Sequence, residues 1–473
     1  MRPITASQKW SYAIGNMPFS VKDAAYVNFV VFYYTQVQGL SGSLAGLAMF
    51  IALSWDAISD PLVGSWSDKV HSRWGRRHPL ILAGGLPTAL LFIALFSVPS
   101  GLGQWGVFAW LTAVSLMLRT FLTINYIPFQ AMGAELATDY DERTVIAKAR
   151  VAMGWLAGMT MPAVGFLFIF TSDGETDGRL IQDNYETYGL LSAFLTAAAT
   201  LICVWGTRSL IERLPKATSS DSWISLKGTI SDFRMAFSNR NFRMTLGSNL
   251  SLGMAIGVYS TLSLYMGTYF WEFSTQQLAA LAIPTLLATM LSFAVIGRLG
   301  SRWDKPTLLA MAALGVAFNS AWFIGARLID VLPENGHPLI YALQLLNAFM
   351  SVFVLVCTHT LTASLIADIL DEQELHTGQR QEGVFFAAGA FVLKATTGFG
   401  ALIAGVVIDF ADIAPGTEPG GVPADSLQML GWFTMCIITA LCLVSYAFTK
   451  MIRLSRADHM RLQAELAAQN ATD

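Results

Sequence analysis

The chain has 473 residues, of which 54% are hydrophobic and only 13% are charged. A soluble domain carries about 25% charged residues, so this composition excludes an ordinary soluble protein and predicts an integral membrane protein. The formal net charge of −3 does not indicate a nucleic-acid partner.

Apolar segments of about 20 residues, the length that crosses a bilayer as a helix, recur along the whole chain. We expect twelve such helices, at 11–36, 42–67, 79–99, 106–135, 142–170, 187–210, 241–270, 276–298, 306–327, 337–367, 383–408 and 427–449. The predicted fold class is an all-α membrane protein with twelve transmembrane helices. No small-residue cleavage site follows the N-terminal residues, so the first helix is expected to direct insertion.

Basic residues are concentrated in alternate loops. The connections after the second, sixth and eighth predicted helices are rich in Lys and Arg, whereas 171–186 contains a single arginine, Arg179, and 409–426 contains none. Because basic loops stay in the cytoplasm, we expect a multi-pass inner (plasma) membrane protein with both termini cytoplasmic.

Two short motifs occur in both halves of the sequence. SRWGRRHP at 72–79 is echoed by SRWDKP at 301–306, and YDERTVIAKAR at 140–150 by LDEQELHTGQR at 370–380, with offsets of 229 and 230 residues. Matching offsets predict a parallel six-helix repeat. Two six-helix bundles with a substrate site between them resemble the major facilitator fold, which is the fold expected here. We expect an N-terminal bundle at 1–212, a cytoplasmic linker at 213–238, and a C-terminal bundle with its tail at 239–473.

Seven charged residues lie inside the predicted helices: Lys22, Asp23, Asp56, Asp60, Arg119, Arg150 and Lys394. Each charge at the middle of a membrane helix costs roughly 2.5–3.5 kcal/mol unless it is compensated. Ion pairs that hold helices together are one explanation. A water-filled cavity that binds a polar solute and a coupling ion explains the group better, because apolar side chains join helices without a desolvation penalty.

Asp56 and Asp60 are separated by four residues, about one helical turn. Two like carboxylates at this spacing repel each other, and a proton, a sodium ion or an arginine relieves the repulsion. This behaviour is typical of a coupling-ion site.

The segment that follows, GSWSDK at 64–69 and RWGRR at 73–77, resembles the cytoplasmic signature of major facilitator transporters. Gly64 is expected to allow close helix approach, and Asp68 to pair with a basic residue or a helix N-terminus. The whole candidate gating motif on this side comprises Gly64, Asp68, Arg73, Arg76, Arg77, Asp141, Arg143 and Arg380.

The order and spacing of several motifs resemble the glycoside–pentoside–hexuronide:cation symporter family. They are VKDAAYVNF at 21–29, FYYTQVQGLS at 32–41, WDAISDPLVG at 55–64, SRWGRRHP at 72–79, INYIPFQAM at 124–132, DERTVIAKAR at 141–150, ADILDEQELHTGQR at 367–380 and FVLKATTGFGA at 391–401. The resemblance implies that Asp56, Asp60 and the position of Tyr126 belong to the cation site. It implies that Lys22, Asp23 and Arg150 line the substrate site, with Asp23 and Arg150 as the expected hydroxyl ligands, and that Lys394 lies near the cavity. Tyr26, Arg119, Tyr126 and Gln130 are further candidate substrate-binding residues of this sequence.

The sequence departs from the family pattern in the fourth predicted helix. Tyr126 stands where the pattern has a third carboxylate, Gln130 stands where it has an indole, and Arg119 adds a charge at a place for a small residue. The sodium ligand set is therefore incomplete, which favours protons over sodium as the coupling ion, since sodium needs about six oxygens. No cofactor is expected besides this cation.

The interior charges sum to four positive and three negative groups, and a positive surplus favours an anionic solute. In the alternative, Arg119 only neutralises Asp56 or Asp60, and no preference for anions follows from it.

The predicted function is cation-coupled symport of a sugar or sugar-like acid, possible examples being a hexuronide or a sulfonated sugar, by alternating access. A carrier of lysolipids or other amphiphiles is the alternative within transport. A membrane enzyme or sensor has less support, because no nucleophile, base or metal set is recognisable, and His359 is a lone histidine. The expected partners are a small solute, the cation and the bilayer, and the protein is expected to be a monomer.

Overall fold

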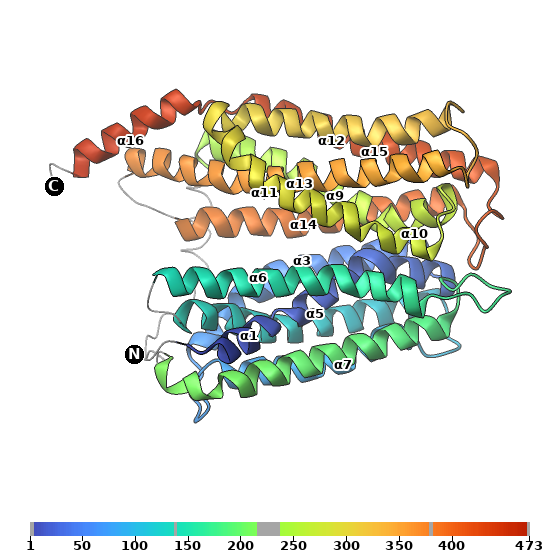
Figure 1. Cartoon of the computed structure of the whole chain (residues 1–473), viewed down its shortest axis with the longest axis horizontal. Coiled ribbons are helices and arrows are strands. Elements are labelled where there is room, and N and C mark those ends of the chain that lie inside the picture. The colour runs from blue at the N-terminus through green and yellow to red at the C-terminus, as the bar shows by residue number, and fades with distance from the viewer. Residues whose placement is uncertain (1–3, 137–139, 215–236, 378–381, 471–473) are drawn as a thin grey trace.

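The computed structural model describes residues 4–136, 140–214, 237–377 and 382–470. All regular elements in these ranges are helical, and no strand occurs among them. Figure 1 shows long helices that run side by side along the longest axis of the molecule. The prediction of an all-α fold is therefore confirmed.

Eleven helices in the described residues are long and apolar enough to cross a membrane. They are α3 (Gly42–Asp68), α4 (His78–Phe96), α5 (Gln104–Leu136), α6 (Tyr140–Val164), α7 (Gln182–Thr207), α9 (Arg240–Tyr265), α11 (Ala282–Arg302), α12 (Lys305–Leu328), α13 (Pro338–Thr377), α14 (Glu382–Ala411) and α15 (Ala424–Lys450). Shorter elements extend or flank them: η3 (Gly165–Ile169), η4 (Arg208–Arg213), η5 (Met266–Phe270), α10 (Thr275–Ala280) and α16 (Arg456–Asn470).

In the described part of the chain, the first expected span, 11–36, is more interrupted than the other spans. It consists of α1 (Ala6–Ile14), α2 (Met17–Ala25) and two π-helical turns, η1 (Tyr26–Val30) and η2 (Tyr33–Val37). Pro18 lies in the first turn of α2, where a missing N–H costs nothing, so the chain restarts its helix there. Interrupted helices of this kind are frequent at functional sites. Among the described residues, eleven helices and not twelve have the length and hydropathy of a membrane span.

The two halves of the sequence lie side by side (Figure 1). The N-terminal half, drawn from blue to green, holds α1 to α7, and the half drawn from yellow to red holds α9 to α16. The most extensive packing between the halves joins α3 to α14. The predicted domain limits stay a prediction, since most of the proposed linker, 215–236, lies outside the described residues.

The halves close together at one end of the molecule, which we call the distal end: residues 36–46, 171–181, 265–274 and 401–418. At the start of α3, Gly42 lies against Gly405 of α14, and one turn later a β-carbon on Gly46 would lie 2.7 Å from the carbonyl oxygen of Ala401. Asp409 caps α3 from the other half, since its carboxylate accepts from the amides of Gly42 at 2.5 Å and of Ser43 at 2.8 Å. A carboxylate at a helix N-terminus is electrostatically favourable.

A buried arginine also joins the halves at the distal end. Arg179 is 2% exposed, and its guanidinium donates to Thr268 Oγ1 at 2.9 Å and to the carbonyl oxygen of Phe273 at 3.0 Å, both in the C-terminal half. Asp177 accepts from Arg179 Nη2 at 2.7 Å. Burial alone would raise the pKa of Asp177, but the hydrogen bonds and charge of Arg179 bring it below its ordinary value.

Candidate functional site

Six of the seven interior charges form three ion pairs in the structure. Lys22 pairs with Asp23 within α2, Arg119 of α5 pairs with Asp56 of α3, and Lys394 of α14 pairs with Asp60 of α3. The structure therefore joins charges that lie up to 334 residues apart in the sequence. Pairing of this kind compensates for placing the charges inside the membrane.

The pair of Arg119 and Asp56 is the more deeply buried of the two pairs on α3. The side chains of Arg119 and Asp56 are 3% and 13% exposed, and the guanidinium lies 4.8 Å from the centre of the Tyr26 ring. Tyr26 is itself buried and donates from its hydroxyl to Ser115 Oγ at 2.9 Å. Tyr26 thus contacts Arg119 and supports it in the structure, and its expected role in substrate binding stays a prediction.

The pair of Asp60 and Lys394 is more accessible and crosses between the halves. Their side chains are 27% and 34% exposed, and Thr123 of α5 also donates to Asp60 Oδ1 at 3.0 Å. Asp60 is therefore held by a hydroxyl from its own half and by an ammonium from the other half. A relative movement of the halves at this level would separate the carboxylate from the ammonium.

The expected repulsion between Asp56 and Asp60 is relieved by two cations of the protein itself. Asp56 turns toward α5 and Asp60 toward both α5 and α14, so each carboxylate of α3 has its own basic partner. An arginine was one of the three ways of relieving the repulsion that the sequence left open. The geometry favours the alternative in which Arg119 neutralises an aspartate over one in which it presents its charge to a solute.

A third group of candidate residues surrounds Tyr126. Gln130 donates to the Tyr126 hydroxyl at 2.7 Å, and the Phe19 ring stacks on the tyrosine with centroids 4.2 Å apart. Arg150 and Asp23 lie close enough to Tyr126 to act on it electrostatically. The side chain of Asp23 is 49% exposed, so this group combines an accessible carboxylate with a phenol, an amide and a guanidinium.

Arg150 is the one of the seven interior charges that forms no ion pair with another described residue. It is half-buried on α6, and no carboxylate in the described part of the chain forms an ion pair with its guanidinium. Its backbone carbonyl accepts from Asn16 Nδ2 at 3.0 Å, which fixes α6 against the start of α2. The positive surplus counted from the sequence is therefore located at Arg150.

The candidate gating motif lies at the end opposite the distal closure. Of two predictions about it, the one for Asp68 is confirmed and the one for Gly64 is wrong. Asp68 pairs with Arg77 at 2.8 Å, as expected of its basic neighbours. Gly64 does not permit a close helix approach, because a β-carbon there would meet only Ile127 Cγ2 at 3.7 Å, an ordinary contact.

Sequence reasoning missed Glu135, which is the main acidic partner in this motif. Its carboxylate accepts from Arg77 at 2.5 Å and from Arg76 at 2.7 Å. The available signal was a glutamate at the end of an apolar run, in AMGAEL. Arg73 and Arg143 are exposed. The side chain of Asp141, and all of Arg380, lie outside the described residues.

The C-terminal half has an equivalent ion pair at the same end. Lys305, at the start of α12, donates to Asp368 of α13 at 2.6 Å, and His459 of α16 lies 3.4 Å from the same carboxylate. Arg77 and Glu135 are likewise at the start of α4 and the end of α5. The repeat inferred from the SRW motifs therefore has a structural counterpart.

Eleven candidate membrane helices in the described part of the chain, with ion pairs in the interior and closure at one end, define a multi-pass membrane transporter of the major facilitator type. Residues 11–456 match the family described as MFS/sugar transport protein, and the chain belongs to that family.

Known relatives agree with this assignment. The chain is 22% identical to the inner membrane symporter YicJ of Escherichia coli, over 86% of this chain and 83% of that protein. It is 24% identical to the glucuronide carrier protein homolog of the same organism, over 84% and 82% of the two chains. The glycoside–pentoside–hexuronide:cation symporter resemblance drawn from the motifs is thereby confirmed, and a multi-pass inner membrane protein is supported.

A solved structure supports the fold. The crystal structure of a D-xylose-proton symporter matches with a TM-score of 0.58 at 15% identity, covering 95% of this chain and 99% of that one. At this identity the likeness shows the fold alone. The relatives and this structural neighbour are transporters and not enzymes.

Proposed function

We propose that this protein is a proton-coupled symporter of a sugar-like acid that works by alternating access. The observation that carries the proposal is the ion pair of Asp60 and Lys394, which joins the two halves beside the Tyr126 group. Asp60 is the carboxylate whose basic partner comes from the opposite half. It is therefore the acid whose environment changes most when the halves move.

Coupling follows from competition between a proton and Lys394 for the same carboxylate. When the halves separate at the level of α3 and α14, Asp60 loses its ammonium partner, and a proton then neutralises it. When Lys394 returns, it stabilises the charged carboxylate and displaces the proton. Sodium is a poorer candidate, because Asp56 is already occupied by Arg119 and sodium needs about six oxygen ligands.

The solute preference is attributed to Arg150 and not to Arg119. Three ion pairs neutralise six charges, so Arg150 provides the remaining positive charge, while Asp23 is accessible for hydroxyl groups. A guanidinium binds a carboxylate or sulfonate through two parallel hydrogen bonds. A relative that is named a glucuronide carrier supports this choice. The lysolipid alternative has weaker support, because this group is rich in hydrogen-bonding side chains.

The basic loops favour cytoplasmic termini, and α1 and α16 lie toward the same end of the bundle (Figure 1). Closure at the distal end then corresponds to an inward-facing state. We assign the distal closure to the periplasmic side on this basis.

The test is uptake into proteoliposomes that contain the purified full chain, with pH and sodium varied independently. Neutral sugars, uronates and sulfonated sugars form the solute panel. Asp60→Asn is expected to retain exchange of the solute but to lose accumulation driven by a proton gradient. Arg150→Gln is expected to lose the preference for acids over neutral sugars. Sodium-driven accumulation at fixed pH, or full accumulation by Asp60→Asn, would overturn proton coupling.

A further inference from the structure

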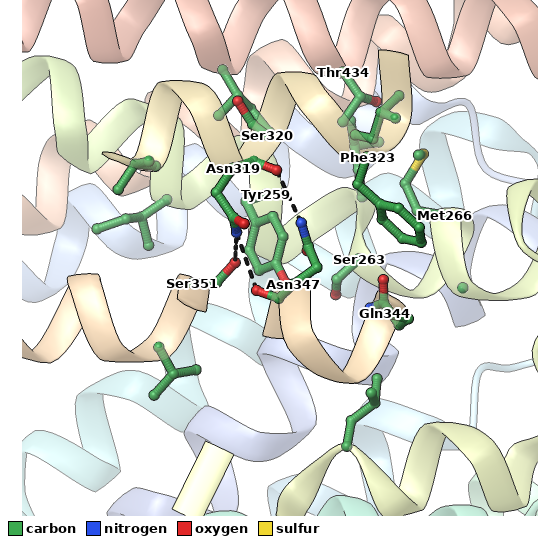
Figure 2. A pocket seen from close by; sticks show the side chains of 18 of the residues that line it. Tyr259, Ser263, Met266, Asn319, Ser320, Phe323, Gln344, Asn347, Ser351 and Thr434 are labelled. Carbon is green, nitrogen blue, oxygen red and sulfur yellow. Dashed lines mark hydrogen bonds between the residues drawn. The ribbon is translucent and has the colours of Figure 1, made fainter. Parts of the chain in front are cut away.

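The C-terminal half contains a cavity of about 210 Å³ that is separate from the ion pairs on α3. It lies among α9, α12, α13 and α15, and Figure 2 shows its wall from close by. Of the residues that line it, none carries a formal charge. Because an unpaired charge is costly in such surroundings, a ligand of this cavity is uncharged.

One wall of the cavity is a fixed polar frame. Asn319 donates to Ser351 Oγ at 2.8 Å and to the carbonyl oxygen of Asn347 at 3.1 Å, and Asn347 donates back to the carbonyl oxygen of Asn319 at 2.9 Å (Figure 2). Trp322 donates to Asn319 Oδ1 at 3.1 Å. The Asn319 amide is fully engaged, so this frame holds α12 and α13 in place and leaves the binding of a ligand to other groups.

A buried hydroxyl group provides a hydrogen-bonding partner for a ligand, which the frame around Asn319 does not provide. Thr434 of α15 lines the cavity and is 2% exposed, and its Oγ1 has no hydrogen-bond partner among the described residues. Gln344 lines the cavity as well, and no side-chain hydrogen bond involves it within the same part of the chain. Buried polar side chains are normally hydrogen-bonded, so this unsatisfied hydroxyl on a residue that lines the cavity points to a ligand.

The remaining wall is apolar and aromatic. Trp271 and Phe323 stack with their centroids 4.1 Å apart, and Tyr259 borders the same space. An apolar cavity of about 150 Å³ is known to accept benzene. A cavity of 210 Å³ therefore has room for one six-membered ring with a small polar substituent. Mostly apolar cavities with a few convergent polar groups are typical of small-molecule sites.

We propose that this cavity is a second ligand site, which binds an uncharged six-membered ring bearing a hydroxyl group. The ring packs between α9 and α13, and its hydroxyl bonds to Thr434. The site is independent of the interior charges, and it goes beyond the transport function proposed above.

Occupation of this site acts on transport through α9. Tyr265 near the end of α9 and Tyr269 of η5 bond to Gln36 of the N-terminal half at 3.1 and 2.9 Å. Leu262 and Met266 of the same segment line the cavity. A ligand held between α9 and α13 therefore stabilises the helix that forms the distal closure, and it slows turnover without competing for the solute site.

Calorimetric titration of the purified full chain with three matched probes tests the site: phenol, toluene, which lacks the hydroxyl, and benzoate, which is charged. Phenol is expected to bind saturably and benzoate not to bind. Thr434→Val is nearly isosteric and is expected to weaken phenol binding about five-fold while leaving toluene unchanged, since one hydrogen bond contributes about 1 kcal/mol. Thr360→Val, on α13 but outside the cavity lining, controls for partition into detergent micelles.

A filling variant and an uptake measurement complete the test. Ala255→Leu is expected to abolish binding of both phenol and toluene; if it fails to fold, the comparison with Thr434→Val still decides. Phenol is expected to lower the maximal uptake rate without changing the solute KM, and Asp60→Asn is expected to retain phenol binding. Equal phenol affinity in the wild type and Thr434→Val, or competition between phenol and the solute, would overturn the proposal.

Discussion

The two halves of the molecule have the same architecture but different interiors. Both have an ion pair at the end opposite the distal closure, Arg77 with Glu135 in one and Lys305 with Asp368 in the other. Deeper inside, the N-terminal half contains buried ion pairs, whereas the C-terminal half contains the neutral frame built on Asn319.

This difference helps to distinguish interior polar groups that a six-helix bundle needs for folding from those that it does not need. Since the C-terminal bundle forms its core with amides and hydroxyls, a six-helix unit of this kind does not need interior charges in order to fold. The charges of the N-terminal half therefore need an explanation beyond folding, and the transport function proposed above would provide one. Lys394 is the one interior charge that the sequence placed in the C-terminal half, and it is directed to a carboxylate of the other half.

The largest expected effect comes from breaking the buried pair in the N-terminal half. Asp56→Asn leaves Arg119 buried without a counter-charge, which should cost about 3–5 kcal/mol and remove most folded protein from the membrane. Folded protein is measured by size-exclusion chromatography in detergent. The double change Asp56→Asn with Arg119→Gln should restore it. Asp60→Asn is the matched control, and it should fold because Lys394 remains partly exposed; equal losses in both single variants would contradict this distinction.

The second largest effect is expected for Arg179. Its guanidinium belongs to the N-terminal half and donates to neutral groups of the C-terminal half. Arg179→Ala should open the distal end, since Thr268 and Phe273 lose a buried donor. The opening is measured as faster labelling of a cysteine introduced at Leu40, which is buried at the distal end, in a variant that lacks the four native cysteines. Arg208→Ala, an exposed arginine at the other end, is the control and should leave labelling unchanged.

The contacts that Arg179 and Asp177 make at the distal end should be insensitive to pH in the physiological range. The pKa of Asp177 is lower in the folded protein, so its contribution is present above the ordinary carboxylate value of about 4 and is lost only as the pH falls below that. Labelling at the distal end should thus stay constant from pH 5 to pH 8. A marked rise in labelling on going from pH 8 to pH 5 would show that another group controls the closure.

Breaking the neutral frame of the C-terminal half should cost less. Asn319→Leu removes donors to Asn347 and Ser351 and leaves those acceptors buried, with an expected loss of about 1–3 kcal/mol. The thermal midpoint in detergent should fall while membrane expression remains. A loss as severe as that of Asp56→Asn would contradict the proposed difference between the halves.

The smallest effect distinguishes two glycines of α3. Gly64→Ala should change stability by no more than about 1 kcal/mol, and in the stabilising direction, because alanine favours a helix and the site has room. Gly46→Ala should instead disturb the contact with α14 and reduce transport. Uptake and thermal midpoint of the two variants measured together test the contrast.

The fold was predictable from the sequence because membrane helices are recognisable by the length and hydropathy of their apolar segments. The exception, residues 11–36, has the apolar length of a span, but Pro18 and the π turns interrupt its hydrogen bonding in ways that hydropathy does not record. The interior charges were predictable for the same reason, since each stood out against an apolar background.

The partners of those charges were not predictable, because they depend on which helices become neighbours. Lys394 and Asp60 are 334 residues apart, and nothing in their local sequences links them. Glu135 was overlooked because an acidic residue at a helix end is ordinary in isolation. The cavity beside Thr434 was not predictable from the sequence. Apolar residues with a few hydroxyl groups form the same sequence pattern whether they line a cavity or a closely packed core.

The link between Asp60 and Lys394 has a consequence for the energetics of a transport cycle. Lys394 competes with protons for the Asp60 carboxylate and is attached to the other half of the protein. The effective concentration of its ammonium group at Asp60 is therefore set by the geometry of the two halves and not by the solution. That effective concentration is high while the halves meet and falls toward zero when they part. Under proton coupling, the direction of net movement follows from which compartment supplies a proton to Asp60 while Lys394 is absent.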